Sequence, residues 1–313
     1  MRPISILMLG GGKRVSLARR FKSAALERDV ALSLLAYEID EQQPISLEAT
    51  VLVGKRWSDP EVAEDILTVV NERDVDLVLS HVDPATSVHA ELRERHPAAS
   101  FSSDAQATAI CASKHRTYDF CQAGGIRSIP LARPGEFPVF GKPDQGSASA
   151  GAQKLDDAAA LDAFLAANAD VILQRFLDGR EYTVDAYVSR AGEILGVSPR
   201  LRVATTGGES VVTETLSHPE IERQSREVID QLGLRGPLTL QFIVERDTDL
   251  CYLMEVNPRF GGGVIASIEA GFEYPGMMLD ELLGRHVEPV SHGRRLVMKR
   301  YFAEAFYAVG DRS

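Results

Sequence analysis

The sequence predicts a protein of mixed α/β and α+β class, in which an N-terminal doubly wound parallel sheet precedes a mainly antiparallel part. Over the first third of the chain, short apolar segments alternate with helical patterns, an order typical of a parallel sheet covered by helices. In the rest of the chain, apolar segments with alternating polarity are separated by short polar turns, which is typical of antiparallel hairpins. The 313 residues are enough for roughly two or three compact units with their own cores.

The N-terminal third begins with an apolar strand followed by three glycines. Strands are expected at 4–9, 32–37, 49–53 and 75–80, and helices at 15–27, 60–73 and 85–95. Gly10, Gly11 and Gly12 follow the first strand directly, so they predict a strand-to-helix turn whose amides could hold an anion.

The composition argues against a nucleic-acid or membrane partner. The chain carries 45 acidic against 34 basic residues, a net charge of −11, whereas a phosphate backbone demands a basic surface. The apolar runs are shorter than a membrane span, and the start of the chain predicts a strand instead of a signal peptide. The three cysteines are widely spaced without a Cys-x-x-Cys motif, which fits reduced thiols in the cytoplasm.

A hairpin in the last quarter of the chain carries the strongest functional signal. Its strands are expected at 238–244 and 250–256, joined by a polar turn. Because side chains alternate along a strand, Glu255 and Asn257 are expected on one face. Gln241 would lie across from them, so three side-chain oxygens would converge. Such hard oxygen ligands suit Mg²⁺, which takes its remaining ligands from water and phosphates.

The same alternation places Met254 and Val256 together on the opposite face. Arg259, just beyond the hairpin, has the planar fork that binds a transferring phosphoryl group. The alternative interpretation is that segment 257–263 merely ends an edge strand, since Asn-Pro and Gly-Gly are ordinary turn signals. That alternative explains Glu255 poorly, because a carboxylate set between two apolar residues needs a partner.

A second signal is the loop of small residues that follows Lys142. An apolar strand leads into this lysine, and the next residues include Gly146 and Ser147. Small residues let backbone amides approach phosphates closely, and the lysine adds a point charge. The spacing does not match a Walker A loop. A flexible Gly/Ser linker remains the alternative for 146–151.

The other segments complete the predicted order of elements. Residues 171–188 predict a strand, a turn at Asp178 and Gly179, and a second strand. Further helices are expected at 113–126, 156–167, 217–233 and 275–283, and further strands at 193–203 and 297–308.

The string Met-Glu-Val-Asn-Pro-Arg-Phe-Gly-Gly-Gly at 254–263 resembles the metal-binding signature of the ATP-grasp superfamily. It is most similar to the branch of the carbamoyl phosphate synthase large subunit. The resemblance implies a pre-ATP-grasp Rossmann-like domain at 1–108, an ATP-grasp small lobe with a glycine-rich flap at 109–173, and a large lobe with the metal site at 174–313.

The resemblance also implies a role for each motif. The residues that would bind ATP are Lys114, Lys142, Gly146, Ser147, Gln174, Phe176 and Glu181. Among them, Gln174 and Phe176 match the hinge beside the adenine, and Glu181 matches the acid that holds the ribose hydroxyls. The residues that would bind Mg²⁺, with Mn²⁺ as an alternative ion, are Gln241, Glu255 and Asn257. The catalytic residues would be Arg259, Lys142 and Arg200, with Arg202 as an alternative to Arg200 for clamping a substrate carboxylate or γ-phosphate.

The implied activity is ATP-dependent ligation of a carboxylate to an amine or similar nucleophile. The reaction would pass through an acyl phosphate and release ADP and phosphate. The expected partners are small-molecule carboxylate and amine substrates, with a homodimer as an expectation at the level of the family. Gln241 stands where many relatives have an acid, so the number of metal ions, one or two, stays open. The chain is too short for a full carbamoyl phosphate synthase, and we do not expect carbamoyl phosphate synthesis.

Two other classes of function remain as alternatives. Gly10 and Gly12, with Glu38 and Asp40 near the end of the second strand, partly match a dinucleotide fingerprint and would suit an NAD(P)-dependent oxidoreductase, but the third glycine is missing. In the ATP-grasp interpretation, Gly11, Gly12 and Lys13 would instead help to hold the second substrate. The other alternative is a catalytically silent ATP-binding protein.

Overall fold

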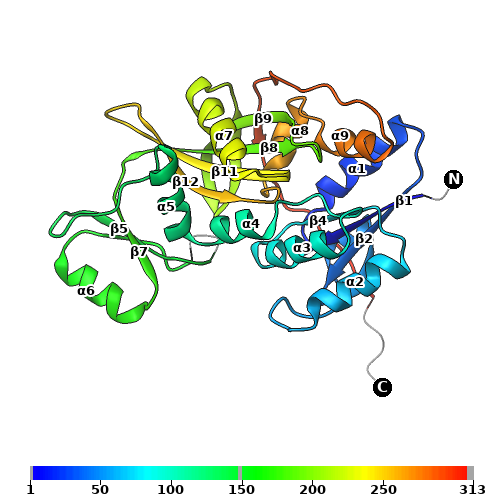
Figure 1. Cartoon of the computed structure of the whole chain (residues 1–313), viewed down its shortest axis with the longest axis horizontal. Coiled ribbons are helices and arrows are strands. Elements are labelled where there is room, and N and C mark those ends of the chain that lie inside the picture. The colour runs from blue at the N-terminus through cyan, green and yellow to red at the C-terminus, as the bar shows by residue number, and fades with distance from the viewer. Residues whose placement is uncertain (1–2, 147–149, 309–313) are drawn as a thin grey trace. The chain divides into compact units, whose positions relative to one another are not determined.

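The computed structural model describes residues 3–146 and 150–308 (Figure 1), and these fall into two compact units. Among the described residues, the first unit comprises 3–102, Glu273–Val287 and 299–308. The second unit comprises Ser103–Phe272 and Glu288–Met298. The three domain ranges expected from the sequence stay a prediction.

The first unit is built on a four-stranded parallel sheet with the order β3-β2-β1-β4. Its strands are β1 (Ile4–Leu9), β2 (Leu32–Glu38), β3 (Thr50–Val53) and β4 (Leu77–Ser80). Its helices are α1 (Val15–Glu27), α2 (Val62–Glu72), α3 (Asp83–Arg95) and α9 (Tyr274–Leu282), with a short 3₁₀ helix at Pro44–Leu47. The predicted parallel sheet is therefore confirmed.

Helices cover this sheet because apolar side chains alternate to both of its faces. Leu7 and Leu9 share a core cluster with residues of α2 and α3. Helix α9 contacts α1, and the two are linked by an ion pair between Arg28 Nη2 and Asp280 Oδ2 at 2.7 Å. A segment far along the chain thus completes the N-terminal layer.

The second unit contains two sheets. The larger has six strands in the order β12-β11-β8-β9-β10-β13, and the smaller has three antiparallel strands in the order β6-β5-β7. The strands of the larger sheet are β8 (Gly179–Val188), β9 (Ile194–Thr206), β10 (Glu209–Thr215), β11 (Gly236–Glu245), β12 (Cys251–Asn257) and β13 (Val297–Lys299). Those of the smaller are β5 (Val139–Pro143), β6 (Gln153–Leu155) and β7 (Val171–Arg175). The helices are α4 (Ala105–Ala112), α5 (Lys114–Gly124), α6 (Ala158–Ala167), α7 (Pro219–Leu232) and α8 (Val264–Glu269).

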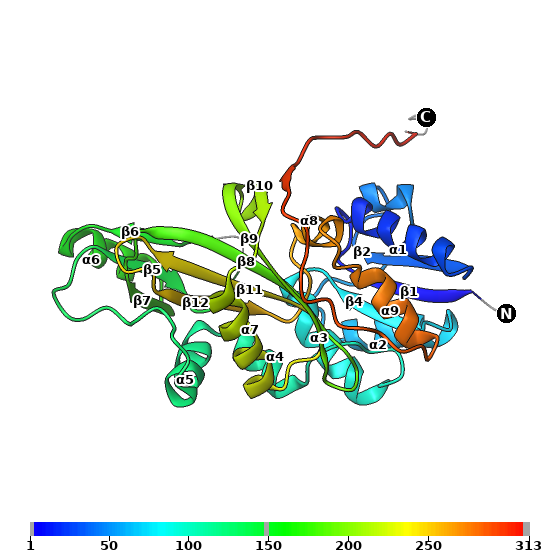
Figure 2. The same cartoon turned by 90° about the horizontal axis from the view of Figure 1, so that it is seen from above.

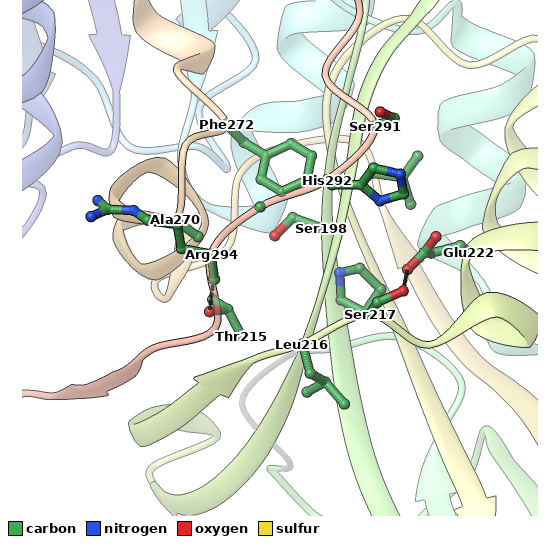
Figure 3. A pocket seen from close by; sticks show the side chains of 13 residues that line it. Ser198, Thr215, Leu216, Ser217, Glu222, Ala270, Phe272, Ser291, His292 and Arg294 are labelled. Carbon is green, nitrogen blue, oxygen red and sulfur yellow. Dashed lines mark hydrogen bonds between the residues drawn. The ribbon is translucent and has the colours of Figure 1, made fainter.

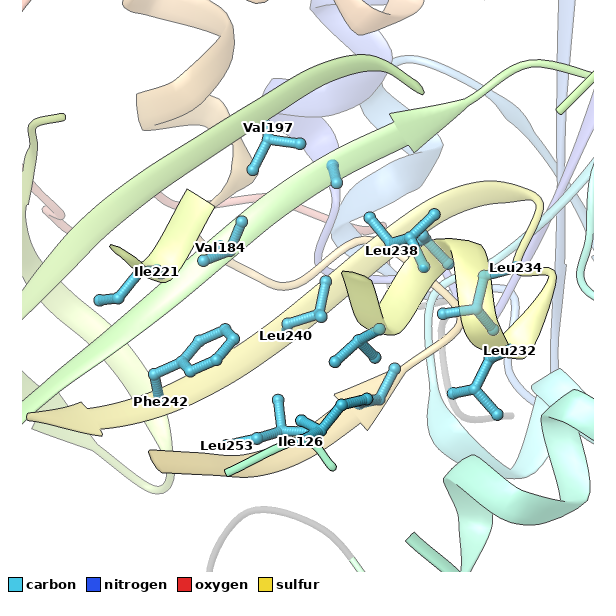
Figure 4. Close-up of a cluster of buried hydrophobic side chains, with 14 of the residues drawn as sticks. Ile126, Val184, Val197, Ile221, Leu232, Leu234, Leu238, Leu240, Phe242 and Leu253 are labelled. Carbon is cyan, nitrogen blue, oxygen red and sulfur yellow. The ribbon is translucent and has the colours of Figure 1, made fainter. Parts of the chain in front are cut away.

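One face of the six-stranded sheet is covered by α4, α5 and α7 (Figure 2). Helix α7 is amphipathic, and its residues Ile221 and Ile229 belong to the same buried cluster as Leu238, Leu240 and Phe242 of β11 (Figure 4). Because alternate residues of a strand point to opposite faces, this packing leaves the intervening residues of β11 on the other face.

Both strands expected within 171–188 are present, but they do not pair with each other. β7 pairs with β5 in the small sheet, while β8 pairs with β9 and β11 in the large one. The final strand is shorter than expected, with only Val297–Lys299 in regular structure among the described residues from 297 onward.

The buried His89 makes the stability of the first unit depend on pH. His89 lies on α3, is 1% exposed, and has its Nδ1 at 3.4 Å from Ser80 Oγ. Burial, with a smaller contribution from Arg93, lowers the pKa of His89 to about 3. The imidazole therefore stays neutral in the folded protein across the range in which an unfolded histidine takes up a proton.

We expect the free energy of unfolding to fall as the pH drops from about 6.5 toward 3, because below about 6.5 only the unfolded state protonates this residue. Urea denaturation of His89→Gln should show a weaker loss of stability between neutral and mildly acidic pH. His292→Gln, which changes an exposed histidine, should keep the wild-type slope. Equal slopes for all three proteins would contradict this assignment.

Candidate functional site

The face of the six-stranded sheet opposite α7 carries a row of polar side chains. Cross-strand pairing links Glu255 to Gln241, Gln241 to Thr183, and Thr183 to Arg200. Directly paired residues lie on the same face of a sheet. The row therefore crosses the four neighbouring strands β12, β11, β8 and β9. Strand pairing brings Thr183 and Glu255, which are 72 positions apart in the sequence, into this one row. We call this surface the polar face.

The three predicted metal ligands meet at one end of this row. Gln241 is paired with Glu255, as expected, and Asn257 follows on the next row. The Asn257 side-chain Nδ2 donates to Glu255 Oε1 at 2.8 Å, so the carboxylate and the amide are in contact. Asn257 is buried and Glu255 is half-buried.

The expected alternation along β12 is wrong at one position. The ladder shifts between the pairs Gln241–Glu255 and Phe242–Leu253, which leaves Met254 as an extra, unpaired residue. Such a bulge turns successive side chains toward one face. Met254 consequently packs beside Ile243 and Tyr252, away from Val256, which belongs to the main core. The sequence gives no local signal for this bulge.

Arg202 connects the predicted metal ligands to the predicted ribose acid. Its Nη1 donates to Gln241 Oε1 at 3.3 Å, and its Nε lies 3.2 Å from Glu181 Oε2. Its Nη2 donates to the Gly208 carbonyl at 3.0 Å. Burial lowers the pKa of Arg202, and Glu181 opposes that shift. Arg202 is thus the arginine of the polar face that contacts predicted site residues, although the predicted catalytic set contained Arg200.

Arg200 lies in the interior beneath the loop that follows β12. It is 2% exposed, and its Nε donates to Asp185 Oδ2 at 2.8 Å, while Ser267 Oγ donates to the same oxygen at 2.7 Å. A Cβ atom at Gly263 would lie only 2.5 Å from Arg200 Cζ, so the guanidinium packs directly against the loop. The predicted role of Arg200 as a clamp stays a prediction, whereas its contacts fit a residue that positions this loop.

Lys142 is held close to these groups by the small sheet. It lies on β5 and is 7% exposed. Burial lowers its pKa to about 8, Lys114 adds to that shift, and Glu255 and Glu181 oppose it. These electrostatic interactions mean that both predicted lysines and both predicted acids lie in one neighbourhood.

Lys114 is the first residue of α5, and it contacts the loop after β5. Its Nζ donates to the Asp144 carbonyl at 2.9 Å and to the Gly146 carbonyl at 3.3 Å. Asp144 is buried, and its Oδ1 accepts from the His115 amide at 2.8 Å and from Ser113 Oγ at 3.1 Å. Asp144 therefore ties the start of α5 to the base of the predicted flap. Ser147, also assigned to the flap, lies outside the described residues.

The two predicted adenine contacts lie at and just beyond β7. Gln174 is buried, pairs with Phe140, and donates from Nε2 to the Ile129 carbonyl at 3.4 Å. Its Oε1 is buried with no hydrogen-bond partner among the described residues. Phe176 lies one residue after β7, with Lys154 Nζ at 5.0 Å from its ring centroid. The assignment of Gln174 and Phe176 to adenine binding stays a prediction.

The donor set is consistent with a hard cation. Among the described residues there is no cluster of three His, Cys, Asp or Glu side chains that could hold a metal by themselves. The available donors are one carboxylate and two amides, from Glu255, Gln241 and Asn257. Such oxygen donors, too few for a closed cage, fit Mg²⁺, which shares its coordination with phosphate oxygens and water. The hydroxyl of Thr183, beside Gln241 in the row, is also buried without a partner among the described residues.

Arg259, the remaining predicted catalytic residue, follows β12. Its carbonyl accepts a hydrogen bond from Thr239 Oγ1 at 2.9 Å, and its Nη1 donates to the Phe260 carbonyl at 3.3 Å. Thr239 pairs with Asn257, so Arg259 is anchored next to the predicted metal ligands.

A pocket elsewhere in the second unit contains none of these residues (Figure 3). Two of its hydroxyl groups are hydrogen-bonded within the protein: Ser217 Oγ donates to Glu222 Oε1 at 2.9 Å, and Thr215 Oγ1 donates to the Arg294 carbonyl at 2.8 Å. The pocket therefore adds nothing to the candidate site.

Comparison with known proteins shows a consistent likeness. The profile of a family described as "ATP-grasp in the biosynthetic pathway with Ter operon" matches residues 167–301. D-alanine–D-alanine ligase of Parabacteroides distasonis is 24% identical over 178 residues, which cover 51% of this chain and 53% of that enzyme. The chain thus spans about half the length of this relative.

Solved structures show the same fold. N5-carboxyaminoimidazole synthetase from Staphylococcus aureus, complexed with ADP, matches with a TM-score of 0.75 and 14% identity over 94% of this chain and 81% of that one. An L-amino acid ligase from Bacillus licheniformis matches with a TM-score of 0.69 and 17% identity over 90% of this chain and 75% of that one. No helix among the described residues is both long and apolar enough to cross a membrane.

The buried Arg200–Asp185 pair gives a prediction about stability. Arg200→Met should destabilise the protein by about 3–5 kcal/mol, because it leaves a buried carboxylate uncompensated. The double variant Arg200→Met/Asp185→Leu should recover most of that loss, since both charges are then gone. Urea denaturation of Arg200→Met, Asp185→Leu and the double variant measures these effects. A loss of unfolding free energy in the double variant equal to the sum of the losses in the two single variants would contradict the pairing.

Asp144 gives a prediction about ligand binding. Asp144→Ala should weaken binding of a non-hydrolysable ATP analogue by about tenfold, because Lys114 and the loop after Lys142 lose their shared anchor. Asp144→Asn, which keeps one acceptor oxygen, should restore part of the affinity. Isothermal titration calorimetry checks this, with the exposed Asp162→Ala in the same lobe as control. Normal affinity in Asp144→Ala would remove its positioning role.

Proposed function

We propose that the chain is a member of the ATP-grasp superfamily and an ATP-dependent ligase joining a carboxylate substrate to an amine or similar nucleophile. The observation that carries this proposal is the convergence of Gln241, Glu255 and Asn257 on the polar face, within electrostatic reach of Lys142. A carboxylate, amides and a buried ammonium in one place are the groups that a metal-bound triphosphate requires.

We assign recognition of ATP to both sheets of the second unit. Gln174 and Phe176 would contact the adenine, and Glu181 would accept hydrogen bonds from the ribose hydroxyls. Glu181 is already held by Arg202, so its carboxylate is positioned before a ligand arrives. Lys114 and Lys142 would bind the phosphates, together with the flap residues Gly146 and Ser147.

Mg²⁺, or Mn²⁺ in its place, would be held by Gln241, Glu255 and Asn257, and when bound it would neutralise charge on the triphosphate. The protein's own contribution is positioning and fixed positive charge. A substrate carboxylate oxygen would attack the γ-phosphorus and release ADP. Lys142 and Arg259 would stabilise the negative charge on the transferring phosphoryl group.

The amine would then attack the carbonyl carbon of the acyl phosphate, forming the new C–N bond as inorganic phosphate leaves and the nitrogen loses a proton. A flap closed over the site would keep water from hydrolysing the acyl phosphate. The described cysteines are buried, and burial raises the pKa of each thiol, so they are unsuited as nucleophiles.

The relatives support this reaction class. The names of the D-alanine–D-alanine ligase and the L-amino acid ligase both describe the joining of a carboxylate to an amine, and the synthetase from Staphylococcus aureus was solved with ADP. We propose small-molecule substrates and a cytoplasmic location. The homodimer stays a prediction.

Glu255→Gln tests the proposal directly. Removing the carboxylate should lower substrate-dependent ADP release by about 10²–10³-fold, because the charge that holds the ion is lost. Electron paramagnetic resonance should also show weaker Mn²⁺ binding in the presence of an ATP analogue. The matched control is Asp247→Asn, an exposed acid on the turn of the same hairpin. The substrates are taken from a panel of acids and amines. If Glu255→Gln turned over substrate and bound Mn²⁺ as well as the wild type does, the metal assignment would be refuted.

A further inference from the structure

The glycine loop of the first unit is lined by hydrogen-bond acceptors. The Gly12 amide donates to the Glu38 carboxylate at the end of β2. A Cβ atom at Gly12 would lie 2.7 Å from Gln43 Oε1 and 3.4 Å from Glu38 Cδ. The Ile45 amide donates to the Gly12 carbonyl at 2.9 Å, which fixes the loop against the 3₁₀ helix that Gln43 precedes. Two side-chain oxygens therefore surround one glycine within a single unit.

The Glu38 carboxylate is incompletely satisfied. Its Oε1 is buried and has no hydrogen-bond partner among the described residues. Burial raises the pKa of Glu38, and the Gly12 amide is the group that counters this shift. A buried acceptor without a partner costs free energy, and more so when it carries charge. Such a group fits a position that a ligand completes.

The arrangement selects against an anion. A glycine loop between a first strand and a helix commonly binds phosphate through its free amides. Here the Gly12 amide is already used by a carboxylate, which would repel a phosphate or a pyrophosphate placed at the same point. This disfavours the dinucleotide interpretation of Gly10–Gly12. A group that completes Glu38 Oε1 must instead donate a hydrogen bond to it.

We propose that Glu38, Gln43 and the Gly12 loop form a binding site for the primary ammonium group of a small ligand. An ammonium has three donors and a positive charge, so it can pair with Glu38 Oε1 and with Gln43 Oε1 together. Ribose hydroxyls also donate, but they bring no charge to offset the buried carboxylate. This site lies entirely within the first unit and does not rest on the ligase proposal.

The test uses the full-length protein and isothermal titration calorimetry. The probes are the amides of the twenty common L-amino acids, which carry an ammonium but no carboxylate, and the N-acetylated form of each amide that binds. We expect at least one amide to bind, its acetylated form to bind at least about tenfold more weakly, and Glu38→Gln to weaken the amide by a similar factor. The matched control is Asp40→Asn, an exposed acid two residues away whose Oδ1 accepts from the Gln42 amide at 2.9 Å.

The outcomes separate this site from the nucleotide site. A circular dichroism spectrum and a urea unfolding curve like those of the wild type show that Glu38→Gln is folded, and Gln43→Leu provides a second variant with the same expected loss of amide binding. The proposal fails if no amide binds, if acetylation or Glu38→Gln leaves binding unchanged, or if inorganic phosphate or NAD⁺ binds and is lost in Glu38→Gln. Absence of ATP-analogue binding in the wild type would instead count against the ligase proposal alone.

Discussion

The packing of α7 against one face of the six-stranded sheet is the constraint on which the candidate site depends. Burial of the apolar residues of β8 and β11 against this helix fixes which face each side chain occupies, and a slip of one residue would exchange the two faces. Glu181, Thr183 and Gln241 are therefore on the polar face because Val184, Leu240 and Phe242 are in the core. The chemistry of the site is set by the hydrophobic pattern on its reverse side.

Internal charges then hold the loops that border the polar face. Arg200 and Asp185 form a buried ion pair under the loop after β12, and Ser267 joins α8 to the same carboxylate. Asp144 plays a similar part beside the small sheet, where its side chain joins the start of α5 to the residues that follow Lys142. Asp185 is 0% exposed and Asp144 is 5% exposed, whereas Glu255 is half-buried and the side chain of Glu181 is 45% exposed. Rigid support of this kind is what a phosphate-binding site needs, because catalysis by positioning tolerates little displacement.

Local patterns in the sequence were sufficient for most elements and for the metal-binding hairpin. Period-two alternation placed Gln241 opposite Glu255, and the strands of the parallel sheet were found from their apolar runs. The sequence could not show that β7 and β8 belong to different sheets, since the partner of β7 is β5, about 30 residues earlier in the chain. The bulge at Met254 lies within a local hairpin, but no residue type there marks an extra residue in the strand. The sequence could not decide between Arg200 and Arg202, because alternation places both on the same face of β9. Their roles differ through their partners: Arg200 pairs with the buried Asp185, and Arg202 pairs with Glu181.

Lys142 adds a thermodynamic consequence to this architecture. With a pKa near 8, a fraction of its side chains is neutral in slightly alkaline solution. An anionic ligand brought beside this ammonium would raise its affinity for protons, so complex formation and proton uptake would be coupled. The apparent heat of association would then vary with the ionisation enthalpy of the buffer, and the buried lysine would be visible in calorimetry without any substitution.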